Sequence, residues 1–208
     1  MPAIKPSKIV CIGRNYAAHA AEFGNEVPAE PLIFLKPPSS LIGTGEAIVL
    51  PAGVGRVDYE GEIGVIIGAR GRHVARAAAW DHVGALVPVN DVSARVLQKK
   101  DGQWSRAKGF DTFCPVGAPV PAEGVDLEAL AVTTKVNGTV RQHAPAASMV
   151  FDIPFLVAHI SRIMTLEPGD LICTGTPDGV GALEPGDEVE VHVAGVGSVK
   201  NTVREEVL

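Results

Sequence analysis

Glu60 and Glu62, two glutamates separated by one glycine, are the first residues whose types and spacing suggest chemistry. In a strand, residues two apart point to the same face, and two carboxylates so close repel each other unless a cation lies between them. Asp91, at the end of the apolar stretch VGALVPVND, can supply a third oxygen ligand from a neighbouring strand. Such a set suits Mg²⁺ or Mn²⁺, whereas zinc prefers histidine or cysteine. The alternative is that the glutamates lie on the solvated face of an amphipathic strand.

His19 and Glu22 have the spacing of a general base and the carboxylate that orients it. They lie three residues apart in the alanine-rich stretch YAAHAAEF (16–23), where they share one face of an expected helix. The carboxylate can hold the imidazole in one tautomer and raise its basicity, so that the imidazole takes a proton from water. The alternative is an ordinary histidine on a polar helix surface.

Lys108 follows Trp104 and precedes Phe110 in the sequence. Partial burial beside these aromatic residues would suit its ammonium group for binding a substrate carboxylate or an oxyanion, although a surface lysine is the commoner outcome. Arg95 and Gln98 lie shortly after the third candidate ligand, and they share a face if that segment is helical. Both would then reach the same pocket.

The loop TGTPDGVG (174–181) directly follows an expected strand. Its glycines allow several backbone N–H groups to point in one direction, which makes a binding site for an anionic oxygen, although an ordinary glycine-rich turn fits equally well. Together, a metal, a base, a cation and an anion-binding loop fit a reaction on a small anionic carbonyl compound.

The elements that must position these residues are short and mostly strands. Apolar or alternating stretches predict strands at 8–12, 32–37, 47–51 and 56–68. A hairpin is predicted over 131–142 around Asn137-Gly138, a long helix over 151–166, a further helix around VARAAAWDHV, and a final hairpin from EVEVHV and SVKNTV. The result is a strand-rich α+β fold with few short helices. The sequence lacks the regular alternation of strands and helices that is typical of a doubly wound sheet, and it lacks a phosphate-binding glycine motif.

Composition excludes several classes of protein. The chain has 208 residues, of which 46% are hydrophobic and 20% charged, and this fits one globular domain. Its net charge is -6 and its basic residues are not clustered, which argues against a nucleic-acid partner. The three separated cysteines, two of them in apolar runs, indicate buried thiols and a reducing compartment, the cytoplasm. The sequence has no secretion signal and no apolar run of membrane-spanning length, so we expect a soluble protein without a membrane partner.

Five motifs occur in a specific order: GRNYAAH-x-x-E, E-G-E before IGVIIG, NDVSAR, AKGFD and GDLICTGTPDGVG. In this order the chain resembles the fumarylacetoacetate hydrolase family, most of all its short single-domain branch of acylpyruvases and oxaloacetate decarboxylases. The resemblance runs from about Ile9 to the final hairpin. It implies a mixed β-roll, the C-terminal-domain type of that family. It also implies a single catalytic domain over 1–208, with a short segment 1–7 before the core, and assembly as a homodimer.

The resemblance also implies roles for individual residues. Glu60, Glu62 and Asp91 match the metal ligands, which would hold Mg²⁺ or Mn²⁺. His19 and Glu22 match the pair that activates water, and Lys108 matches a lysine that contacts the substrate. The substrate-binding positions are then Arg14, Tyr16, Arg95, Gln98, Gly175 and Thr176. The chain departs from many relatives in having Val96 after Arg95, where those relatives have aspartate.

The reaction we expect from this resemblance is hydrolytic C–C cleavage of an acylpyruvate, a 2,4-dioxo acid such as acetylpyruvate or fumarylpyruvate, through a pyruvate enolate. The same site would also serve an oxaloacetate decarboxylase or a 2-hydroxy-dienoate isomerase or decarboxylase. An alternative from a different class is a non-catalytic ligand-binding β-roll. A serine hydrolase is disfavoured because the G-x-S-x-G motif is missing from the sequence.

Overall fold

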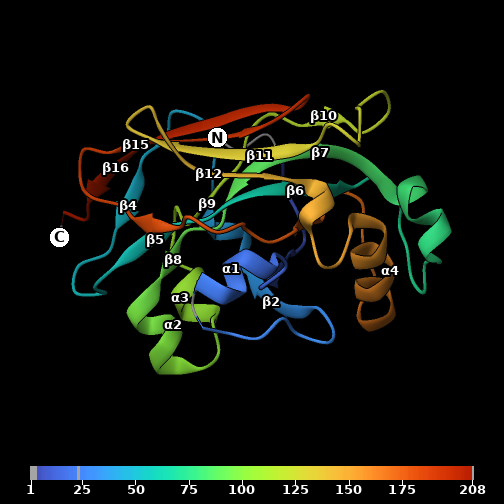
Figure 1. The fold of residues 1–208 in the computed structure, drawn as a ribbon, viewed down its shortest axis with the longest axis horizontal. Helices are drawn as coiled ribbons and strands as arrows, with labels where there is room; N and C mark the ends of the chain where they lie inside the picture. The colour runs from blue at the N-terminus through green and yellow to red at the C-terminus, as the bar shows by residue number, and fades with distance from the viewer. Residues whose placement is uncertain (1–3, 23, 208) are drawn as a thin grey trace.

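Two large β-sheets form the framework of the molecule. The computed structural model describes them within residues 4–22 and 24–207 (Figure 1). The six-stranded sheet consists, in spatial order, of β10 (Val120–Pro121), β7 (Val83–Asn90), β6 (Gly61–Ile67), β13 (Leu171–Cys173), β1 (Ile9–Gly13) and β2 (Leu32–Lys36). The five-stranded sheet consists of β12 (Thr139–Pro145), β11 (Ala131–Val136), β15 (Glu188–Val193), β16 (Gly197–Glu205) and β4 (Ile48–Leu50).

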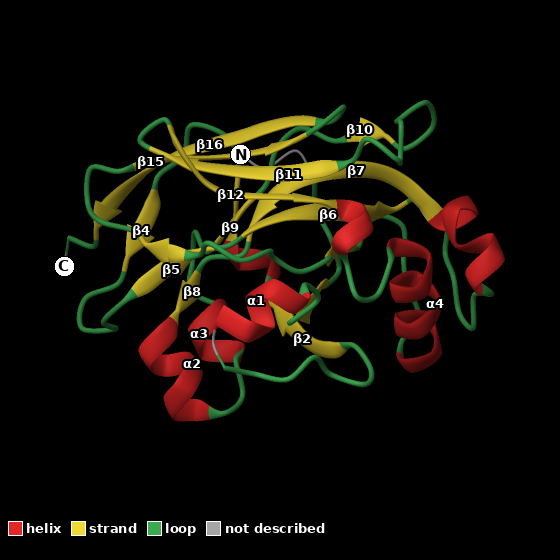
Figure 2. Cartoon of the chain, in the orientation of Figure 1, coloured by secondary structure: helices red, strands yellow, loops and turns green. Residues whose placement is uncertain are grey.

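Two smaller sheets and several short helices complete the described fold. The three-stranded sheet consists of β14 (Gly181–Ala182), β5 (Val57–Tyr59) and β8 (Ser93–Ala94), and the two-stranded sheet of β3 (Leu41–Ile42) and β9 (Cys114–Pro115). The α-helices are α1 (Ala17–Glu22), α2 (Arg95–Asp101), α3 (Ser105–Lys108) and α4 (Ile153–Ile163). The 3₁₀-helices are η1 (Pro38–Ser40), η2 (Arg76–His82) and η3 (Ala146–Ser148). Figure 2 shows α1, α2 and α3 gathered on one side of the strands, with α4 lying apart from them.

The main hydrophobic core lies between the two large sheets and continues under α4. Val65 of β6 and Val191 of β15 belong to it, together with Leu156 and Ile160 of α4. Helix α4 begins where the side chain of Asp152 accepts a hydrogen bond from the N–H of Phe155 (2.8 Å), which satisfies one of the free donors of the first turn. The predicted helix is therefore confirmed, although it starts two residues later than the pattern indicated.

The stretch predicted as one strand over 56–68 is divided at Glu60. Its first part, β5, pairs with β8 and β14, whereas its second part, β6, lies between β7 and β13 in the six-stranded sheet. Every residue from Val57 to Ile67 is buried, so neither face of the stretch is solvated. The alternating residues of this stretch therefore face two buried environments: the apolar side chains face one, and the acidic side chains face the other.

Other predictions have mixed outcomes. The hairpin at Asn137-Gly138 is confirmed, and both turn residues have the positive φ that a type I′ turn requires, 52° and 77°. The predicted helix around VARAAAWDHV is a 3₁₀-helix, η2. This segment is short and joins two adjacent antiparallel strands, so it is unfavourable for a full α-helix to nucleate there. The three cysteines are buried and unpaired, as expected.

The strand-rich α+β fold with few short helices is thus confirmed. None of the helices in the described residues is both long enough and apolar enough to span a lipid bilayer.

Candidate active site

Three buried carboxylates converge where β5, β6 and β7 meet. Glu60 lies in the break between β5 and β6, Glu62 lies in β6, and Asp91 directly follows β7. Antiparallel pairing places Gly61 opposite Asn90, so the three acidic residues become neighbours. One carboxylate oxygen from each lies within 4.8 Å of the others, and the three residues are 4%, 1% and 0% exposed. This burial contradicts the alternative of a solvated strand face.

Gly61, between the two glutamates, has no room for a side chain. A Cβ atom there would lie 1.9 Å from Oγ1 of Thr134 on β11. The backbone of Gly61 bonds to the surrounding side chains instead. Its N–H donates to Oε1 of Gln142 (3.0 Å), and its carbonyl oxygen accepts from the hydroxyl of Thr176 (2.9 Å). The amide of Gln142 in turn donates to Oγ1 of Thr176 (2.8 Å), so the glycine is locked to the candidate anion-binding loop.

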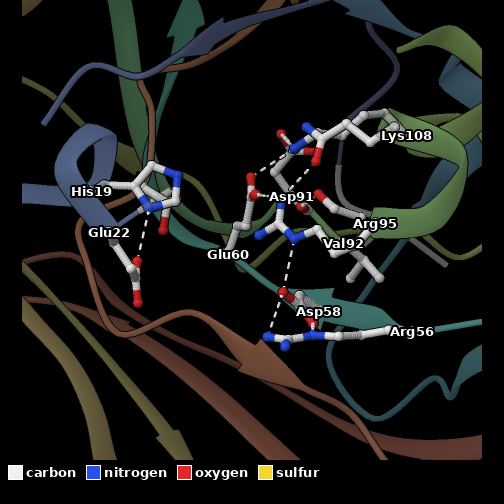
Figure 3. Close-up of polar contacts among 12 residues, drawn as sticks. His19, Glu22, Arg56, Asp58, Glu60, Asp91, Val92, Arg95 and Lys108 are labelled. Atoms are coloured by element: carbon white, nitrogen blue, oxygen red, sulfur yellow. Dashed lines mark hydrogen bonds and ion pairs between the residues drawn. The ribbon is translucent and has the colours of Figure 1, made fainter. Parts of the chain in front are cut away.

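Cationic side chains neutralise two of the three carboxylates. Nζ of Lys108 lies 2.6 Å from Oε2 of Glu60 and 2.7 Å from Oδ2 of Asp91, so it bridges them (Figure 3). Lys36 occupies the other oxygen of Asp91 (2.6 Å), and Arg95 occupies the other oxygen of Glu60 (2.6 Å). Burial alone would raise the pKa of Glu60, but the charges of Lys108 and Arg95 hold it well below its usual value.

Glu62 lacks such compensation. Its carboxylate accepts a hydrogen bond from the N–H of Gly175 (2.8 Å), and within the described part of the chain no lysine, arginine or histidine forms an ion pair with it. Burial and the negative charges of Asp91 and Glu60 raise the pKa of Glu62 well above its usual value. A cation bound beside these oxygens would offset the repulsion between the three carboxylates and stabilise the ionised form of Glu62. The donor set therefore fits a hard divalent ion such as Mg²⁺ or Mn²⁺.

A chain of ion pairs fixes Arg95 at the start of α2. Nε of Arg95 lies 2.7 Å from Oδ2 of Asp58, whose other oxygen binds Arg56 (2.6 Å), as Figure 3 shows. Arg95 also donates to Oε1 of Gln98 one turn later (2.9 Å), so these two residues do share a helix face. Asp58 is fully buried, and its position between two arginines sets the direction of Arg95 toward Glu60.

His19 and Glu22 form the expected pair on α1. Nδ1 of His19 lies 3.2 Å from Oε2 of Glu22, and the other carboxylate oxygen accepts a hydrogen bond from the N–H of Gly179 (3.2 Å). In Figure 3 the imidazole lies across from Asp91 and Lys108, with Glu60 between them. Two N–H groups of the 174–181 loop, those of Gly175 and Gly179, thus bond to carboxylates of the protein itself.

One cavity of about 450 Å³ joins these groups. Most of the predicted site residues line it, namely Arg14, His19, Glu60, Glu62, Arg95, Gln98, Lys108 and Thr176. The other lining residues are Ile12, Gly13, Asn25, Phe34, Lys99 and Trp104.

The remaining predicted residues are not among those that line the cavity. Asp91, Glu22 and Gly175 each bond to a lining residue. Tyr16 packs in the main hydrophobic core and is 2% exposed, so its role in substrate binding stays a prediction. Lys36 was missed. The signal available was a lysine that ends the apolar strand LIFLK, a place where a buried lysine needs an anionic partner.

Comparisons with known proteins identify the family of the chain. The family model described as Fumarylacetoacetate (FAA) hydrolase C-terminal matches residues 8–204. The chain is 44% identical over 197 residues to the mitochondrial oxaloacetate tautomerase FAHD1 of Rattus norvegicus, and the match covers 92% of this chain and 89% of that protein.

Two solved structures are also similar to this one. The 5-carboxymethyl-2-hydroxymuconate delta-isomerase of Mycobacterium smegmatis has a TM-score of 0.91 and 45% identity, and the match covers 99% of this chain and 81% of that one. The fumarylpyruvate hydrolase of Pseudomonas aeruginosa, in complex with Mn²⁺ and pyruvate, has a TM-score of 0.92 and 31% identity, with coverage of 98% and 91%. These relatives are enzymes, and the family match spans nearly the whole chain. The chain belongs to the fumarylacetoacetate hydrolase family.

Proposed function

We propose that this chain is a divalent-metal-dependent enzyme that hydrolyses the C–C bond between C3 and C4 of an acylpyruvate. The observation that carries this proposal is that one cavity holds both a His–Glu pair and a buried carboxylate cluster. A hydrolysis of this kind needs a base for water and a way to carry negative charge on the 2-oxo group. A non-catalytic binding protein needs neither.

The proposed metal ligands are Glu60, Glu62 and Asp91. A bound Mg²⁺ or Mn²⁺ would polarise the 2-oxo group of the substrate and carry the negative charge that develops on its oxygen. The complex of the Pseudomonas aeruginosa relative with Mn²⁺ and pyruvate supports this choice of ion, because pyruvate is a product of the proposed reaction. Lys36 and Lys108 hold the Asp91 carboxylate from both sides, so its direction is fixed before any ligand binds.

His19 is the proposed base. Because Glu22 accepts the hydrogen bond at Nδ1, we assign the proton to that nitrogen, and Nε2 is then the nitrogen that takes a proton from water. The resulting hydroxide attacks C4 of the substrate, and the electron pair of the C3–C4 bond passes into the 2-oxo group to give the pyruvate enolate. His19 then returns its proton to C3. The products are pyruvate and the carboxylate of the acyl group.

Lys108 and Thr176 are the proposed contacts for substrate oxygens. Both are almost fully buried and both line the cavity. The ammonium group of Lys108 has three N–H donors, of which Glu60 and Asp91 accept two, so one remains for an anionic oxygen. A donor in such a water-poor site stabilises a developing oxyanion strongly.

Proton transfer alone is a second candidate activity. The relatives at 44% and 45% identity are named as a tautomerase and an isomerase. The same residues would support both reactions, because removal of a proton from C3 by His19 gives an enolate of the intact substrate, whose negative charge develops on the same 2-oxo oxygen, without attack by water. Decarboxylation of oxaloacetate breaks the C3–C4 bond by loss of CO₂ and gives the pyruvate enolate, again without attack by water, and we keep it as a further candidate reaction.

The test is a substrate panel with metal control. Acetylpyruvate cleavage, oxaloacetate tautomerisation and oxaloacetate decarboxylation are measured after chelation and again after addition of Mg²⁺ or Mn²⁺. We expect metal-dependent cleavage of acetylpyruvate that Glu62→Gln and His19→Ala both abolish. His192→Ala, on the exposed part of β15, is the matched control and should keep full activity. Tautomerisation without cleavage would favour the second candidate, and turnover that survives chelation would exclude the metal role.

We also propose a small 2-oxo acid as the partner of this chain, with no nucleic acid, and a homodimer in the cytoplasm. Light scattering coupled to size-exclusion chromatography measures the assembly, and a monomeric mass would contradict the dimer.

A further inference from the structure

Gly179 connects the His–Glu pair to the strand that leads into the carboxylate cluster. Its N–H donates to Oε1 of Glu22 (3.2 Å), and its carbonyl oxygen accepts a hydrogen bond from the hydroxyl of Tyr59 (2.9 Å). Tyr59 is the last residue of β5 and directly precedes Glu60. Successive hydrogen bonds therefore link the phenol of Tyr59, through one glycine, to Glu22 and then to Nδ1 of His19.

The carboxylate of Glu22 depends on a contact from outside its own helix. Glu22 is the last residue of α1, a helix of only six residues, and its side chain is 32% exposed. The ends of such short helices fray readily. Within the described chain, this carboxylate has two hydrogen-bond partners, the imidazole of His19 and the N–H of Gly179, and Figure 3 shows the first of these bonds. The N–H of Gly179 therefore fixes the carboxylate that orients the imidazole.

The backbone around Gly179 is itself held closely. The φ of Gly179 is 90°, and a Cβ atom there would lie 2.2 Å from the carbonyl oxygen of Arg141 on β12, so that only glycine fits. Two residues earlier, the amide of Gln142 donates to the carbonyl oxygen of Pro177 (2.8 Å). The hydroxyl of Tyr59 adds a second side-chain anchor to this loop, at the residue that contacts Glu22.

The phenol ring of Tyr59 has little freedom to move. Tyr59 is 4% exposed and packs in a hydrophobic cluster with Val136 and Leu183. It pairs with Gly181 of β14, where a Cβ atom would lie 2.8 Å from the hydroxyl oxygen and 3.2 Å from the ring. Tyr59 is not among the residues that line the cavity. Because phenylalanine would fill the same apolar space, the hydroxyl is what tyrosine adds at this position.

We propose that Tyr59 is a positioning residue of the active site: its hydroxyl holds Gly179 in place, so that the N–H of Gly179 orients Glu22. Glu22 then keeps the proton of the neutral His19 on Nδ1. This inference rests on the proposed function of His19 and Glu22, and it adds a residue that does not touch the substrate. Loss of the hydroxyl leaves the residues that line the cavity unchanged, so it lowers kcat and changes KM little.

The experiment is a double-mutant cycle. Acetylpyruvate cleavage with added Mg²⁺ is measured for the parent, Tyr59→Phe, Glu22→Ala and the double variant. Thr133→Val is the control, because it also removes a hydroxyl hydrogen bond (2.9 Å, to His143) from a strand and lies outside the cavity. Mn²⁺ affinity is measured for each protein by electron paramagnetic resonance. That measurement shows that the variants are folded, and it detects any effect on the neighbouring Glu60.

We expect Tyr59→Phe to lower kcat about 3- to 15-fold, the factor that corresponds to one hydrogen bond of ordinary strength, with KM within about twofold of the parent. In the Glu22→Ala background the same change should lower kcat by less than about twofold, since the group that it orients is gone. Thr133→Val should keep kcat within about twofold, and Tyr59→Phe should keep the parental Mn²⁺ affinity.

The tautomer of His19 provides a readout that does not depend on turnover. Nitrogen-15 spectra of histidine-labelled protein distinguish the two neutral tautomers, and comparison with His19→Ala assigns the signals. Spectra are recorded at about pH 8.5, where an ordinary histidine is neutral. The parent should have the proton of His19 mainly on Nδ1. Tyr59→Phe should shift part of the population to Nε2–H, whereas Thr133→Val should leave it unchanged.

Three results would overturn the inference: a kcat of Tyr59→Phe within twofold of the parent, an equal loss in both backgrounds, or an unchanged tautomer population. A fall in Mn²⁺ affinity that matches the fall in kcat also overturns it, because Tyr59 would then act through Glu60. If the parent cleaves no acylpyruvate, the proposed function fails separately, and the tautomer measurement alone decides whether Tyr59 orients the pair.

Discussion

Gly61→Ala tests whether the two candidate glutamate ligands depend on the glycine between them. The added Cβ would lie 1.9 Å from Oγ1 of Thr134, far inside the distance of ordinary van der Waals contact. Thr134 is fully buried in β11, so its side chain cannot move toward solvent. Overpacking of a well-packed core costs about 1 to 3 kcal/mol, and we expect a loss of folding free energy near the upper end of that range.

The companion substitution Thr134→Ala removes the atom that collides. In Gly61→Ala/Thr134→Ala the nearest remaining neighbours of the new methyl group would be Oε1 of Gln142 and Cβ of residue 134, both at 3.3 Å. These contacts are tight but need shifts of only a few tenths of an ångström. The double variant should therefore recover about 1 to 2 kcal/mol relative to the sum of the two single changes, since residues in direct contact are coupled by energies of this size.

Urea denaturation measures the free energies of unfolding, and titration with Mn²⁺, followed by electron paramagnetic resonance, measures metal affinity. Gly61→Ala should weaken Mn²⁺ binding about tenfold or more because it displaces Glu60 and Glu62, and the double variant should regain part of the affinity. Additive losses without coupling would show that Thr134 is not the obstacle. A Gly61→Ala protein with parental stability and parental Mn²⁺ affinity would refute the reasoning.

Four further changes have definite expected outcomes. Thr134→Val should leave the free energy of unfolding unchanged or raise it by at most about 1 kcal/mol, because the buried hydroxyl has no hydrogen-bond partner in the described part of the chain. A decrease of more than about 1 kcal/mol in urea denaturation contradicts this. The side chain of the buried Asn15 forms three hydrogen bonds to the backbone of Phe151 and Thr174, so Asn15→Ala should cost about 2 to 4 kcal/mol in the same assay, and a loss below about 0.5 kcal/mol contradicts this. Burial would raise the pKa of Asp170, but the hydrogen bond from Lys8 and further donors lower this pKa below its value in the unfolded chain. The ionised Asp170 therefore stabilises the folded state above about pH 4, and this stabilisation is lost as the pH falls through the folded pKa. Asp170→Asn should therefore destabilise the protein more at pH 7 than at pH 3, and an equal loss at both pH values contradicts this. Mg²⁺ should raise the melting temperature of the parent by binding to the folded state, and Glu62→Gln should remove that shift; an equal shift in the variant places the ion elsewhere.

Local pattern predicts much of this fold because hairpins and alternating strands have short-range signals. Asn137-Gly138 specifies its turn through the two positive φ angles, and the E-G-E spacing specifies two carboxylates on one side of a strand. The division of 56–68 at Glu60 has no such signal. It depends on pairing with β8 and β14, which are distant in the sequence.

The site shows the same limit. His19 and Glu22 could be paired from sequence because they are three residues apart on one helix. Lys36 could not be assigned to Asp91, which lies 55 residues away, because that contact requires knowing how distant strands are arranged. Gln142 is similar, since a polar residue on a hairpin usually faces water. Here the opposite sheet covers it, and its amide bonds to Gly61 and Thr176.

The floor and the rim of the cavity belong to different parts of the architecture. Glu60, Glu62 and Asp91 lie in or beside paired strands, whose register cannot shift without turning every side chain to the opposite face. Arg14, Lys99 and Trp104 lie instead at helix ends and in the short connections around α1, α2 and α3, outside the paired strands. A randomised library confined to 99–106 should therefore yield folded, metal-binding proteins with new ligand preferences, whereas a library of the same size in β6 should mostly yield insoluble ones. Substitutions that change ligand preference are therefore tolerated in the helical connections around the cavity and not in the strands that carry the carboxylates.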